Sequence, residues 1–596
     1  MEFFDNDPEE DEEERVIFRS DEPKTLSKND SDHQKRDEGE SSTQEEKRYP
    51  SRDRKPPARF GDYVTDDQSF EEYSDAASSS IDYFYKVNDI PLTYEEVLLS
   101  SEADKWQKAM QEEVSSLIEN ETYDVVPRST HQVIGGRWVY AKKGSGDDVT
   151  YKARYVAKGY SQIPGVDYTE TFSPTARFTS IRVLLNLAMK ENFVIHQMDV
   201  KSAYLNANID CDIYLEQPKG FESKGKNNES KVLKLKKSLY GLKQSGRMWN
   251  NLLHGFLVGQ GFIRSDADNC VYTRSKNGSK TIILIWVDDL IITGSDLATV
   301  EKVKLALSNK FKMKDFGQIS EFIGIQFDFF DDCVKLHQSN YIDRILSKFQ
   351  MSDANPKSVP CDASAAKIDF VDAKPFEDNR LYREIVGSLV YLTSCTRPDL
   401  AFVITKLSQC LENPTEAHFK LCKFVLKYLK GSKSKGLIYY KGKGDIDLIA
   451  YSDSDWGSSS DRKSISGYCF KLNHADSFVS WRTKRQNVVA LSTCEAEYIS
   501  VTHALQEGLF LRQLLNDLIS CSKSIVLHVD NKGTIDLANN PVHNQRTKHV
   551  DIRYHFIRQC VREGIVFLVH VSSCDNLADV FTKPATKPNM PKFFIN

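Results

Sequence analysis

The sequence lacks the cysteine spacing that zinc modules and disulfide-rich domains need. Its 596 residues include 12 cysteines, but no CxxC pair and no cysteines followed by histidines at zinc-finger spacing. This pattern excludes a zinc finger or zinc knuckle as the basis of function. Scattered cysteines behind an acidic N-terminus are typical of a protein in a reducing compartment.

Long apolar runs and low-complexity composition are also missing. The strongest run, Thr281–Ile292, contains two adjacent aspartates and is shorter than the roughly 20 apolar residues of a membrane span. We therefore expect no membrane partner. With 40% hydrophobic residues, 29 glycines and 19 prolines, the composition excludes collagen-like and wholly disordered chains.

Charge is distributed unevenly along the chain. Residues 1–80 carry a formal charge of about −13 and the rest about +7, which together give the net charge of −6. A segment this polar buries too little apolar surface to offset its ordering entropy. Residues 1–85 are therefore predicted to be a disordered acidic tail and linker, and the basic remainder is compatible with a polyanionic partner.

Hydrophobic periodicity predicts helices and strands in alternation from residue 91 onwards. The predicted helices cover 93–119, 178–191, 296–311, 339–350, 380–411, 415–430 and 492–519. The predicted strands include a hairpin over 133–142 and 149–158, a strand ending near Asp199, a hairpin around Trp286–Asp289, and strands over 446–453, 465–472, 477–482 and 525–530. This alternation indicates two separate catalytic folds joined by a mostly helical connection.

Two apolar runs end in aspartates. The first, Ile195–Val200, contains Asp199, and the second, Ile282–Val287, is followed directly by Asp288 and Asp289. A charge at the end of a buried strand is costly unless it is paired or bound to a metal. Carboxylates converging from two strands are the ligands that Mg²⁺ needs when it also binds substrate phosphates. The pattern therefore favours metal-dependent phosphoryl transfer.

A second group of carboxylates follows residue 446. Its members are Asp453, Glu497, Asp530 and Asp579. Acidic residues at the ends of successive strands and on facing helices can share a pair of divalent ions, and such ions activate water against a phosphodiester. Asp453 and Asp455 are alternatives for the same position in this group. We favour Asp453, because Asp453 directly follows the apolar part of its strand.

At these residues the sequence resembles the Pol polyproteins of copia-type LTR retrotransposons. The segments similar to the reverse transcriptase are Trp138–Tyr140, Tyr151–Gly159, Thr171–Pro174, Gln197–Asn206, Tyr214–Phe221, Ser238–Ser245 and Val287–Leu290. The segments similar to the ribonuclease H domain are Tyr451–Trp456, Ser466–Gly467, Ala490–Tyr498, Val529–Asn531 and Thr547–Phe556. Two positions depart from the family, since Trp286 replaces the usual tyrosine and Ala207 the usual glycine.

The resemblance implies an α+β and α/β multidomain fold. A right-hand polymerase with fingers, palm and thumb would occupy 86–350, a helical connection 351–445, and a ribonuclease H-like α/β domain 446–590. We further expect the chain to be a C-terminal portion of Pol, or a genomic copy that starts at an internal methionine.

The family's functional residues carry over to matching positions. The catalytic and metal-binding residues would be Asp199, Asp288, Asp289, Asp453, Glu497, Asp530 and Asp579. The substrate-binding residues would be Lys152, Arg154, Tyr204, Tyr240, Gly241, Lys243 and Gln244. Tyr204 matches the steric gate against a ribose 2′-hydroxyl, and Lys152 with Arg154 would contact the triphosphate. Glu497 is preferred to Glu495 because its spacing from Ser492 fits the ribonuclease H pattern. The roles of His549, His555 and His570 stay open.

The implied function is RNA-directed DNA polymerase activity with cleavage of the RNA in an RNA–DNA hybrid. The cofactor would be Mg²⁺, two ions per active site, with Mn²⁺ as a substitute. The partners would be an RNA template, a DNA primer, the RNA–DNA hybrid and dNTPs, with a homo-oligomer or association with other retroelement proteins left open. The expected location is a cytoplasmic virus-like particle, with the nucleus as the alternative. The competing hypothesis is an inactive relic or a co-opted nucleic-acid-binding protein.

Overall fold

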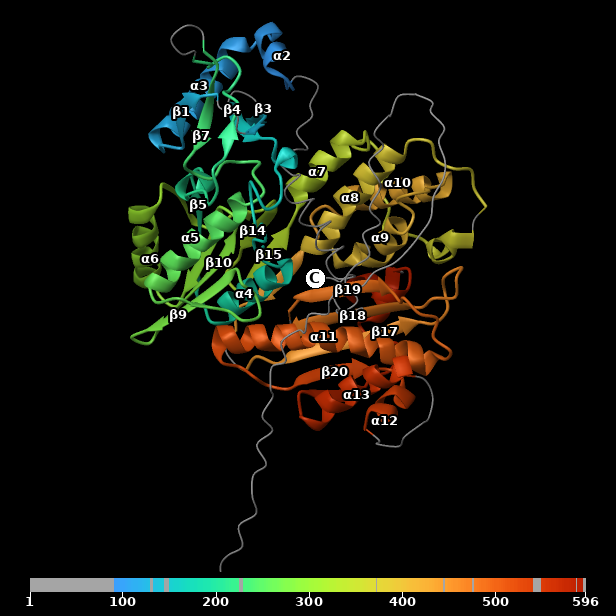
Figure 1. The fold of residues 1–596 in the computed structure, drawn as a ribbon. Coiled ribbons are helices and arrows are strands. Elements are labelled where there is room, and N and C mark those ends of the chain that lie inside the picture. Colours follow the sequence, from blue (N-terminus) through green and yellow to red (C-terminus); the bar gives the residue numbers. More distant parts are fainter. Residues whose placement is uncertain are drawn as a thin grey trace, which may run out of the picture. The chain divides into compact units, whose positions relative to one another are not determined.

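The structure, a computed structural model, describes residues 90–592 except 129–131, 144–148, 224–228, 371, 443–444, 474–475, 540–547 and 586. The acidic tail and linker predicted over 1–85 lie outside the described residues, and so does the turn of the first hairpin at 144–148. Figure 1 shows the described elements coloured along the chain. No helix in this part of the chain has the length and apolarity to cross a membrane.

The N-terminal part packs two helices against a β-hairpin. The predicted helices are α2 (Tyr94–Leu99) and α3 (Ala103–Glu119), and the predicted hairpin is β3 (Gly136–Lys143) with β4 (Thr150–Ala157). Trp106 of α3 is fully buried, and the rings of Tyr140 and Tyr151 meet it edge-on at 5.5 and 4.8 Å. Short strands form a second sheet in the order β1 (Tyr123–Pro127), β7 (Lys231–Leu235), β6 (Tyr214–Leu215) and β2 (Val133–Ile134).

A six-stranded antiparallel sheet follows. Its strands lie in the order β12 (Met313–Gln318), β5 (Val194–Val200), β11 (Asp289–Gly294), β10 (Ser279–Trp286), β9 (Val271–Lys276) and β8 (Ile263–Arg264). The same apolar core includes side chains of α4 (Phe178–Lys190), α5 (Ser245–Gly259) and α6 (Leu297–Lys310). Every residue of β10 from Thr281 to Trp286 is buried, which explains why this strand is continuously apolar in sequence.

The next segment joins a small sheet to a group of helices. The small sheet has the order β13 (Glu321–Phe322), β14 (Ile325–Phe329), β15 (Cys333–His337) and β16 (Leu437–Tyr440). The helices are α7 (Ser339–Lys348), α8 (Asn379–Cys395), α9 (Ala401–Ser408) and α10 (Glu416–Gly431). The helical stretch expected over 380–411 is divided at Pro398, because proline lacks an amide donor and disfavours helical backbone in Arg397 before it.

The C-terminal part is a mixed five-stranded sheet. Its order is β19 (Ser480–Arg485), β18 (Ile465–Leu472), β17 (Leu448–Asp455), β20 (Ile525–Val529) and β21 (Val566–His570). The last three strands are parallel and the others antiparallel. The helices are α11 (Thr493–Ile519), which packs on β17 and β18, and then α12 (Lys532–Asn539), α13 (Lys548–Arg562) and α14 (Asp579–Thr582). The predicted fold class of mixed α+β and α/β parts is thus confirmed, while the domain boundaries stay a prediction.

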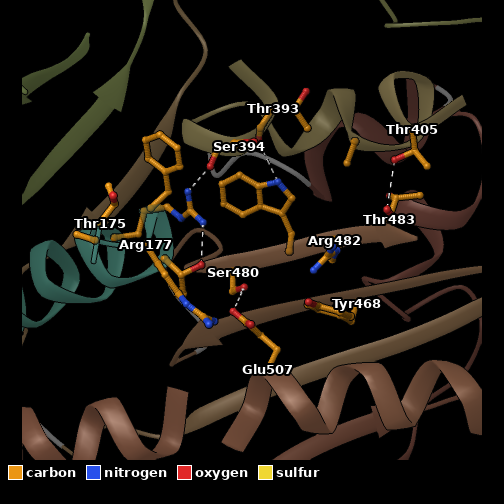
Figure 2. Close-up of a pocket in the computed structure, with 16 residues that line it drawn as sticks. Thr175, Arg177, Thr393, Ser394, Thr405, Tyr468, Ser480, Arg482, Thr483 and Glu507 are labelled. Atoms are coloured by element: carbon orange, nitrogen blue, oxygen red, sulfur yellow. Dashed lines mark hydrogen bonds between the residues drawn. The ribbon is translucent and has the colours of Figure 1, made fainter. Parts of the chain in front are cut away.

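Arg182 of α4, a helix in the core of the six-stranded sheet, connects this core to the C-terminal sheet. Its buried guanidinium donates to the carbonyl oxygens of Val479 at 2.7 Å and Ser394 at 2.5 Å. It also lies 4.1 Å from the centre of the Trp481 ring. Figure 2 shows the side chains of this junction, which line a cavity of about 120 Å³. Helix α4, helix α8 and the β19 region are therefore held to one another by one buried cation.

The helical segment contains a fully buried ion pair, and we expect the fold to depend on it. Arg397 donates to both Asp399 oxygens at 3.0 and 2.7 Å, and neither side chain has any exposed surface. Asp399→Asn leaves the guanidinium without a countercharge and should lower the free energy of unfolding by about 3–5 kcal/mol. Urea unfolding followed by circular dichroism measures this loss. Asp343→Asn breaks a half-exposed pair with Lys433 and should change it by less than about 1 kcal/mol. Equal losses in the two variants would contradict the prediction.

Two candidate active sites built on carboxylates

The turn between β10 and β11 positions the first pair of adjacent aspartates. Trp286 pairs with Asp289 across the hairpin, so only Val287 and Asp288 form the turn. Val287 has a φ of 57°, a left-handed conformation that two-residue turns need and β-branched residues avoid. Its backbone is strained by about 1–3 kcal/mol. The indole of Trp249 donates to the Val287 carbonyl oxygen at 2.7 Å and holds the turn in place.

Asp199 joins these aspartates through the register of β5. In the antiparallel pairing of β5 and β11, Asp199 stands directly opposite Asp289, so both side chains project from the same face of the sheet. Gln197, two residues earlier on that face, donates to Asp289 Oδ1 at 3.5 Å. Carboxylates on directly opposite residues of paired strands repel each other unless a cation or a proton compensates their charge. The structure therefore brings Asp199, Asp288 and Asp289 to one end of the six-stranded sheet.

Two tyrosines and an arginine lie beside this first group. The rings of Tyr204 and Tyr240 are 4.7 Å apart, and the Arg154 guanidinium lies 4.4 Å from the centre of the Tyr240 ring. Burial and the Asp288 carboxylate raise the pKa of Tyr204 to about 12, and they also raise the pKa of Tyr240. Among the described residues the Tyr240 hydroxyl has no hydrogen-bond partner. Lys152 lies two residues before Arg154 on β4, on the same side of the strand.

Gly241 lets the segment after Tyr240 approach β4 closely. The amide of Ala157 donates to the Tyr240 carbonyl oxygen at 2.9 Å. A Cβ on Gly241 would lie 2.1 Å from the Ala157 carbonyl oxygen, and the φ of 92° also favours glycine. This position therefore requires glycine. The close approach that Gly241 permits keeps Tyr240 beside β4, the strand that carries Arg154.

Lys243 and Gln244 occupy different surroundings. Lys243 Nζ lies 3.0 Å from the Tyr168 hydroxyl at an exposed position. Gln244 is fully buried, and its amide donates to the Asp167 carbonyl oxygen at 2.7 Å and accepts from Gln162 at 3.0 Å. Because the Gln244 side chain is bound within the protein, we interpret it as a residue that positions the segment.

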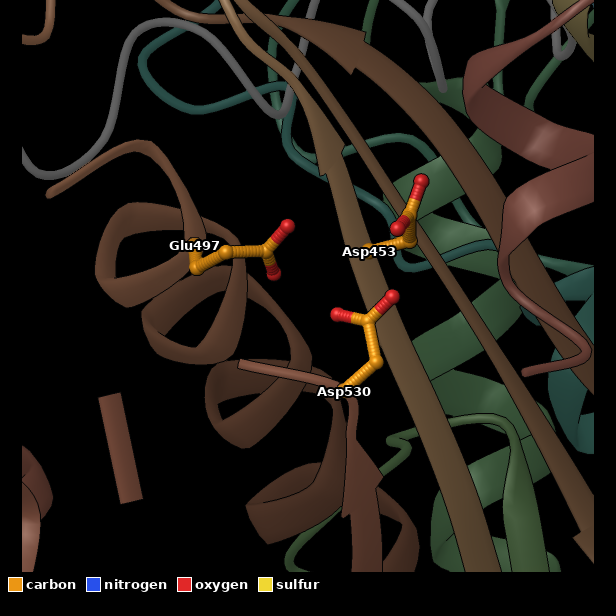
Figure 3. Close-up of side chains that lie close together, drawn as sticks. All are labelled: Asp453, Glu497 and Asp530. Atoms are coloured by element: carbon orange, nitrogen blue, oxygen red, sulfur yellow. The ribbon is translucent and has the colours of Figure 1, made fainter. Parts of the chain in front are cut away.

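The second group of carboxylates meets at the ends of two parallel strands. Asp453 lies near the end of β17, Asp530 directly follows the neighbouring β20, and Glu497 comes from α11. One carboxylate oxygen from each residue lies within 4.8 Å of those of the other two, and no other set of three acidic, histidine or cysteine residues in the described part of the chain meets this distance. Figure 3 shows the three side chains close together, with Glu497 reaching from its helix toward the strand ends that carry Asp453 and Asp530. We refer to Asp453, Glu497 and Asp530 as the trio.

Burial dominates the electrostatics of the trio. Asp453 and Glu497 are only 2% and 5% exposed. Burial raises the pKa of Asp453 to about 6, with Asp530 adding to the rise and the Thr582 hydroxyl opposing it. Burial, Asp453 and Asp530 together raise the pKa of Glu497 well above its usual range. Such strongly raised pKa values mark a place where a cation would be favourable.

The hydrogen bonds of Glu497 leave one ligand atom available. Its Oε1 accepts from the Ser454 amide at 2.9 Å and the Ser454 hydroxyl at 3.0 Å. Its buried Oε2 has no hydrogen-bond partner among the described residues. This unpaired oxygen and the carboxylates of Asp453 and Asp530 together form a donor set that fits a hard divalent cation such as Mg²⁺.

The remaining acidic candidates lie around the trio. Asp579 is the first residue of α14 and forms an ion pair with Lys583. Asp455 lies at the end of β17 outside the trio. Glu495 lies in the first turn of α11, where Ser492 is the N-cap, and its carboxylate accepts from the amide of Leu491 just before the helix.

Neither His555 nor His570 contributes a ligand to the trio. His555 on α13 and His570 at the end of β21 are exposed, and the side chain of His549 lies outside the described residues.

Several residues around both sites were not predicted from the sequence. Gln197 and Trp249 support the first group, and Ser454, Thr582 and Lys583 surround the second. A two-residue period along β5 relates Gln197 to Asp199. A helical spacing of three and four residues relates Thr582 and Lys583 to Asp579. Trp249 and Ser454 reach their sites through tertiary contacts that no local spacing reveals.

Comparisons with known proteins show similarity to a polymerase family and to retrotransposon polyproteins. Residues 120–363 match the family described as "Reverse transcriptase (RNA-dependent DNA polymerase)". The chain is 39% identical over 496 residues to the "Retrovirus-related Pol polyprotein from transposon RE1" of Arabidopsis thaliana, covering 82% of this chain and 33% of that protein. The corresponding protein from transposon TNT 1-94 of Nicotiana tabacum is 38% identical over 507 residues, covering 83% and 38%. The chain thus spans about a third of the length of these curated relatives.

More distant similarities extend to yeast and to a virus. A "Truncated transposon Ty1-A Gag-Pol polyprotein" of Saccharomyces cerevisiae is 28% identical, covering 81% of this chain and 41% of that protein. Among solved structures, the foamy viral protease-reverse transcriptase in complex with dsDNA aligns with a TM-score of 0.45 at 11% identity. This alignment covers 79% of this chain and 83% of that chain.

Cation binding at the trio is expected to depend on pH. The pKa of Asp453 is about 6 in the folded protein against an ordinary value of 3.8. Between these values the folded protein keeps a proton that the unfolded chain has lost, so the stability of the metal-free protein falls as the pH rises through this window. A cation that replaces the proton reverses this loss. The rise in Tm on adding Mg²⁺ should therefore be larger at pH about 7 than at pH about 5.

Thermal unfolding with and without Mg²⁺ at both pH values measures this difference. The Asp453→Asn variant should lose the contribution of Asp453, so that its rise in Tm differs less between the two pH values. The Asp461→Asn variant should keep it, because Asp461 is a partly exposed aspartate paired with Arg485 outside the trio. An equal rise at both pH values in the unmodified protein would show that the raised pKa of Asp453 is not linked to metal binding.

Proposed function

We propose that the chain is an RNA-directed DNA polymerase that also cleaves the RNA of an RNA–DNA hybrid, because residues 120–363 match the reverse transcriptase family and most of the chain is similar to retrotransposon Pol polyproteins. The observation that carries this proposal is the register that sets Asp199 opposite Asp289 beside Asp288. The trio supports the second activity. The substrates would be an RNA template, a DNA primer and dNTPs.

In the first site, the residues divide the work of binding the nucleotide and the metal. Asp199, Asp288 and Asp289 would hold divalent ions, and a bound Mg²⁺ or Mn²⁺ would supply the Lewis acid for attack of the primer hydroxyl on the α-phosphate. Arg154 would pair with the triphosphate. Tyr204, which packs against the Tyr240 ring, would crowd a ribose 2′-hydroxyl and thereby select dNTPs.

In the second site, the trio would hold the metal and Asp579 would lie beside it. The metal would supply activated water for attack on a phosphodiester. The unpaired Oε2 of Glu497 supports this assignment, because it offers a ligand atom that would otherwise be buried at a cost. The hybrid would be held through its backbone and shape, without reading of sequence.

The two activities are expected to be separable by mutation. Asp288→Asn with Asp289→Asn should reduce dTTP incorporation on poly(rA)/oligo(dT) to the level without enzyme, while cleavage of an RNA–DNA hybrid continues. Asp453→Asn with Glu497→Gln should have the opposite effect. Both pairs keep the size of the side chains and remove only charge, so circular dichroism should be unchanged.

The same assay distinguishes the proposal from its competitor. An unmodified protein that is folded and binds the hybrid but shows neither activity would support an inactive relic or a co-opted nucleic-acid-binding protein. Incorporation that survives the double substitution of Asp288 and Asp289 would contradict the assignment of the first site.

Tyr204 is expected to control the choice of sugar. Tyr204→Val removes the ring and should raise the ratio of rNTP to dNTP incorporation by about 10–200-fold, the range that steric discrimination of a small group provides. Primer extension with each nucleotide type measures the ratio. Tyr160→Val removes a tyrosine that is 80% exposed and should leave the ratio unchanged. An unchanged ratio in the Tyr204 variant would remove Tyr204 from the role of steric gate.

A further inference from the structure

A cavity of about 480 Å³ lies among α5, α6 and the hairpin of β9 and β10. Its floor is apolar and includes the half-buried ring of Phe256 and the buried Phe262 and Val303. Strand β10 leads from this cavity to the first site, since Ser279 at its start lines the cavity and Asp288 follows its end. At about 3.3 Å per residue the strand spans roughly 23 Å, so the cavity is separate from the first site.

Three cations line the same cavity, namely Arg274 and Lys276 of β9 and Lys302 of α6. Arg274 lies 4.5 Å from the centre of the Phe262 ring and donates to the Gln260 carbonyl oxygen at 3.1 Å. Within the described part of the chain, none of the three cations forms an ion pair and no acidic residue lines the cavity. We refer to this feature as the cationic cavity.

One carboxylate lies near the cationic cavity without lining it. Asp296 is the N-cap of α6 and accepts from the Thr299 amide at 2.7 Å. Hydrogen bonds from Ser279 and Thr299, with a smaller contribution from Lys302, lower the pKa of Asp296. With Asp296 counted, the formal charge around the cavity is still +2. The cavity is therefore complementary to an apolar group that is flanked by carboxylates.

The turn between β14 and β15 offers this chemistry on the same chain. Phe330 is 54% exposed, and Asp331 and Asp332 beside it are exposed as well. The Phe330 amide donates to the Cys333 carbonyl oxygen at 2.8 Å, which closes the turn. The Lys441 amide donates to the Asp332 carbonyl oxygen at 2.7 Å, and even with this neighbouring lysine counted the turn has a negative charge. We refer to Phe330–Asp332 as the acidic tip.

We propose that the acidic tip of one copy of the chain docks in the cationic cavity of a second copy. Phe330 would lie against the apolar floor, and the two aspartates would lie beside the three cations. The acidic tip is held by the four-stranded sheet and does not line the cavity of its own chain, so a tip that fills the cavity must come from another molecule. Because the two surfaces differ, the contact either closes reciprocally into a dimer or continues from copy to copy.

Sedimentation velocity of the full chain, whose monomer has a mass of 68.0 kDa, tests this contact. A contact of this size is small, so we expect the average mass to rise between about 1 and 100 µM. Lys276→Glu with Lys302→Glu should weaken the association by about tenfold, because two attractions become two repulsions. Lys374→Glu with Lys420→Glu makes the same change of charge at two exposed lysines outside the cavity and should leave the association unchanged.

An exchange of charges separates the contact from damage to the fold. Asp331→Lys with Asp332→Lys should weaken the association as much as the reversal of the two cavity lysines. The four substitutions together in one chain exchange the signs of the two surfaces and should restore the association. Circular dichroism should be the same for all these variants. If the reversal of the cavity lysines lowers the Tm, Lys276→Gln with Lys302→Gln replaces it and should still weaken the association.

Loss of association in each pair of substitutions and its return in the fourfold variant would support the proposal. A chain that keeps the monomer mass up to about 100 µM would overturn it, and so would association that survives both pairs or a folded fourfold variant that stays monomeric. Cavity substitutions that leave the mass unchanged but weaken binding of an RNA–DNA hybrid would also overturn it and would identify the cavity as a nucleic-acid contact. Sedimentation measures mass and not activity, so these outcomes do not depend on the proposed function.

Discussion

Carboxylates brought together at the ends of buried strands repel one another, and the scaffold around both sites has to resist this repulsion. For two unit charges about 5 Å apart at an effective dielectric constant of about 20, the repulsion is roughly 3 kcal/mol. Burial of one aliphatic side chain contributes about 1.5–3 kcal/mol. The four buried residues Ile282–Ile285 of β10 therefore outweigh the cost of holding Asp199 opposite Asp289. The burial of the apolar strands thus offsets the repulsion between the carboxylates.

The two sites limit their repulsion by different means. The carboxylates of the first site are only partly buried, so water screens part of their charge. The trio has no such screening, since Asp453 and Glu497 are almost completely buried. Protons or cations must then compensate the charge, which is why burial raises the pKa of both residues. The second site is consequently the more sensitive of the two to cations, including the lysine ammonium groups beside it.

The sequence allowed prediction of the elements that depend on local pattern. The helices at 93–119, the hairpin at β3 and β4, and the strands that contain Asp199 and Asp453 all follow from hydrophobic period and are present, although β5 continues to Val200 and β17 to Asp455. Pairings between distant segments could not be predicted in this way. Strand β16 pairs with β15 across the proposed boundary between the polymerase and the connection. This pairing could not be predicted, because the sequence of a strand does not reveal which distant strand its backbone will pair with.

Site residues show the same division between local and distant information. Asp453 and Asp455 have the same type and nearly the same position in sequence, and only the neighbouring strand β20 and helix α11 place Asp453 in the trio. Glu495 and Glu497 differ because Glu495 accepts from the Leu491 amide just before α11, whereas Glu497 belongs to the trio. Gln244 lies in a predicted substrate-binding motif, and the structure shows its buried side chain donating to the Asp167 carbonyl oxygen, while its role in substrate binding stays a prediction. Helix α11 also carries Asp517, which accepts from Ser265 Oγ at 2.6 Å. Arg182 of α4 makes a second polar contact between these parts of the chain. A relative movement of the two sites would break both contacts. Each buried group left without a hydrogen-bond partner would cost about 1–3 kcal/mol. The buried polar contacts between the parts therefore resist a change in the spacing between the first group and the trio.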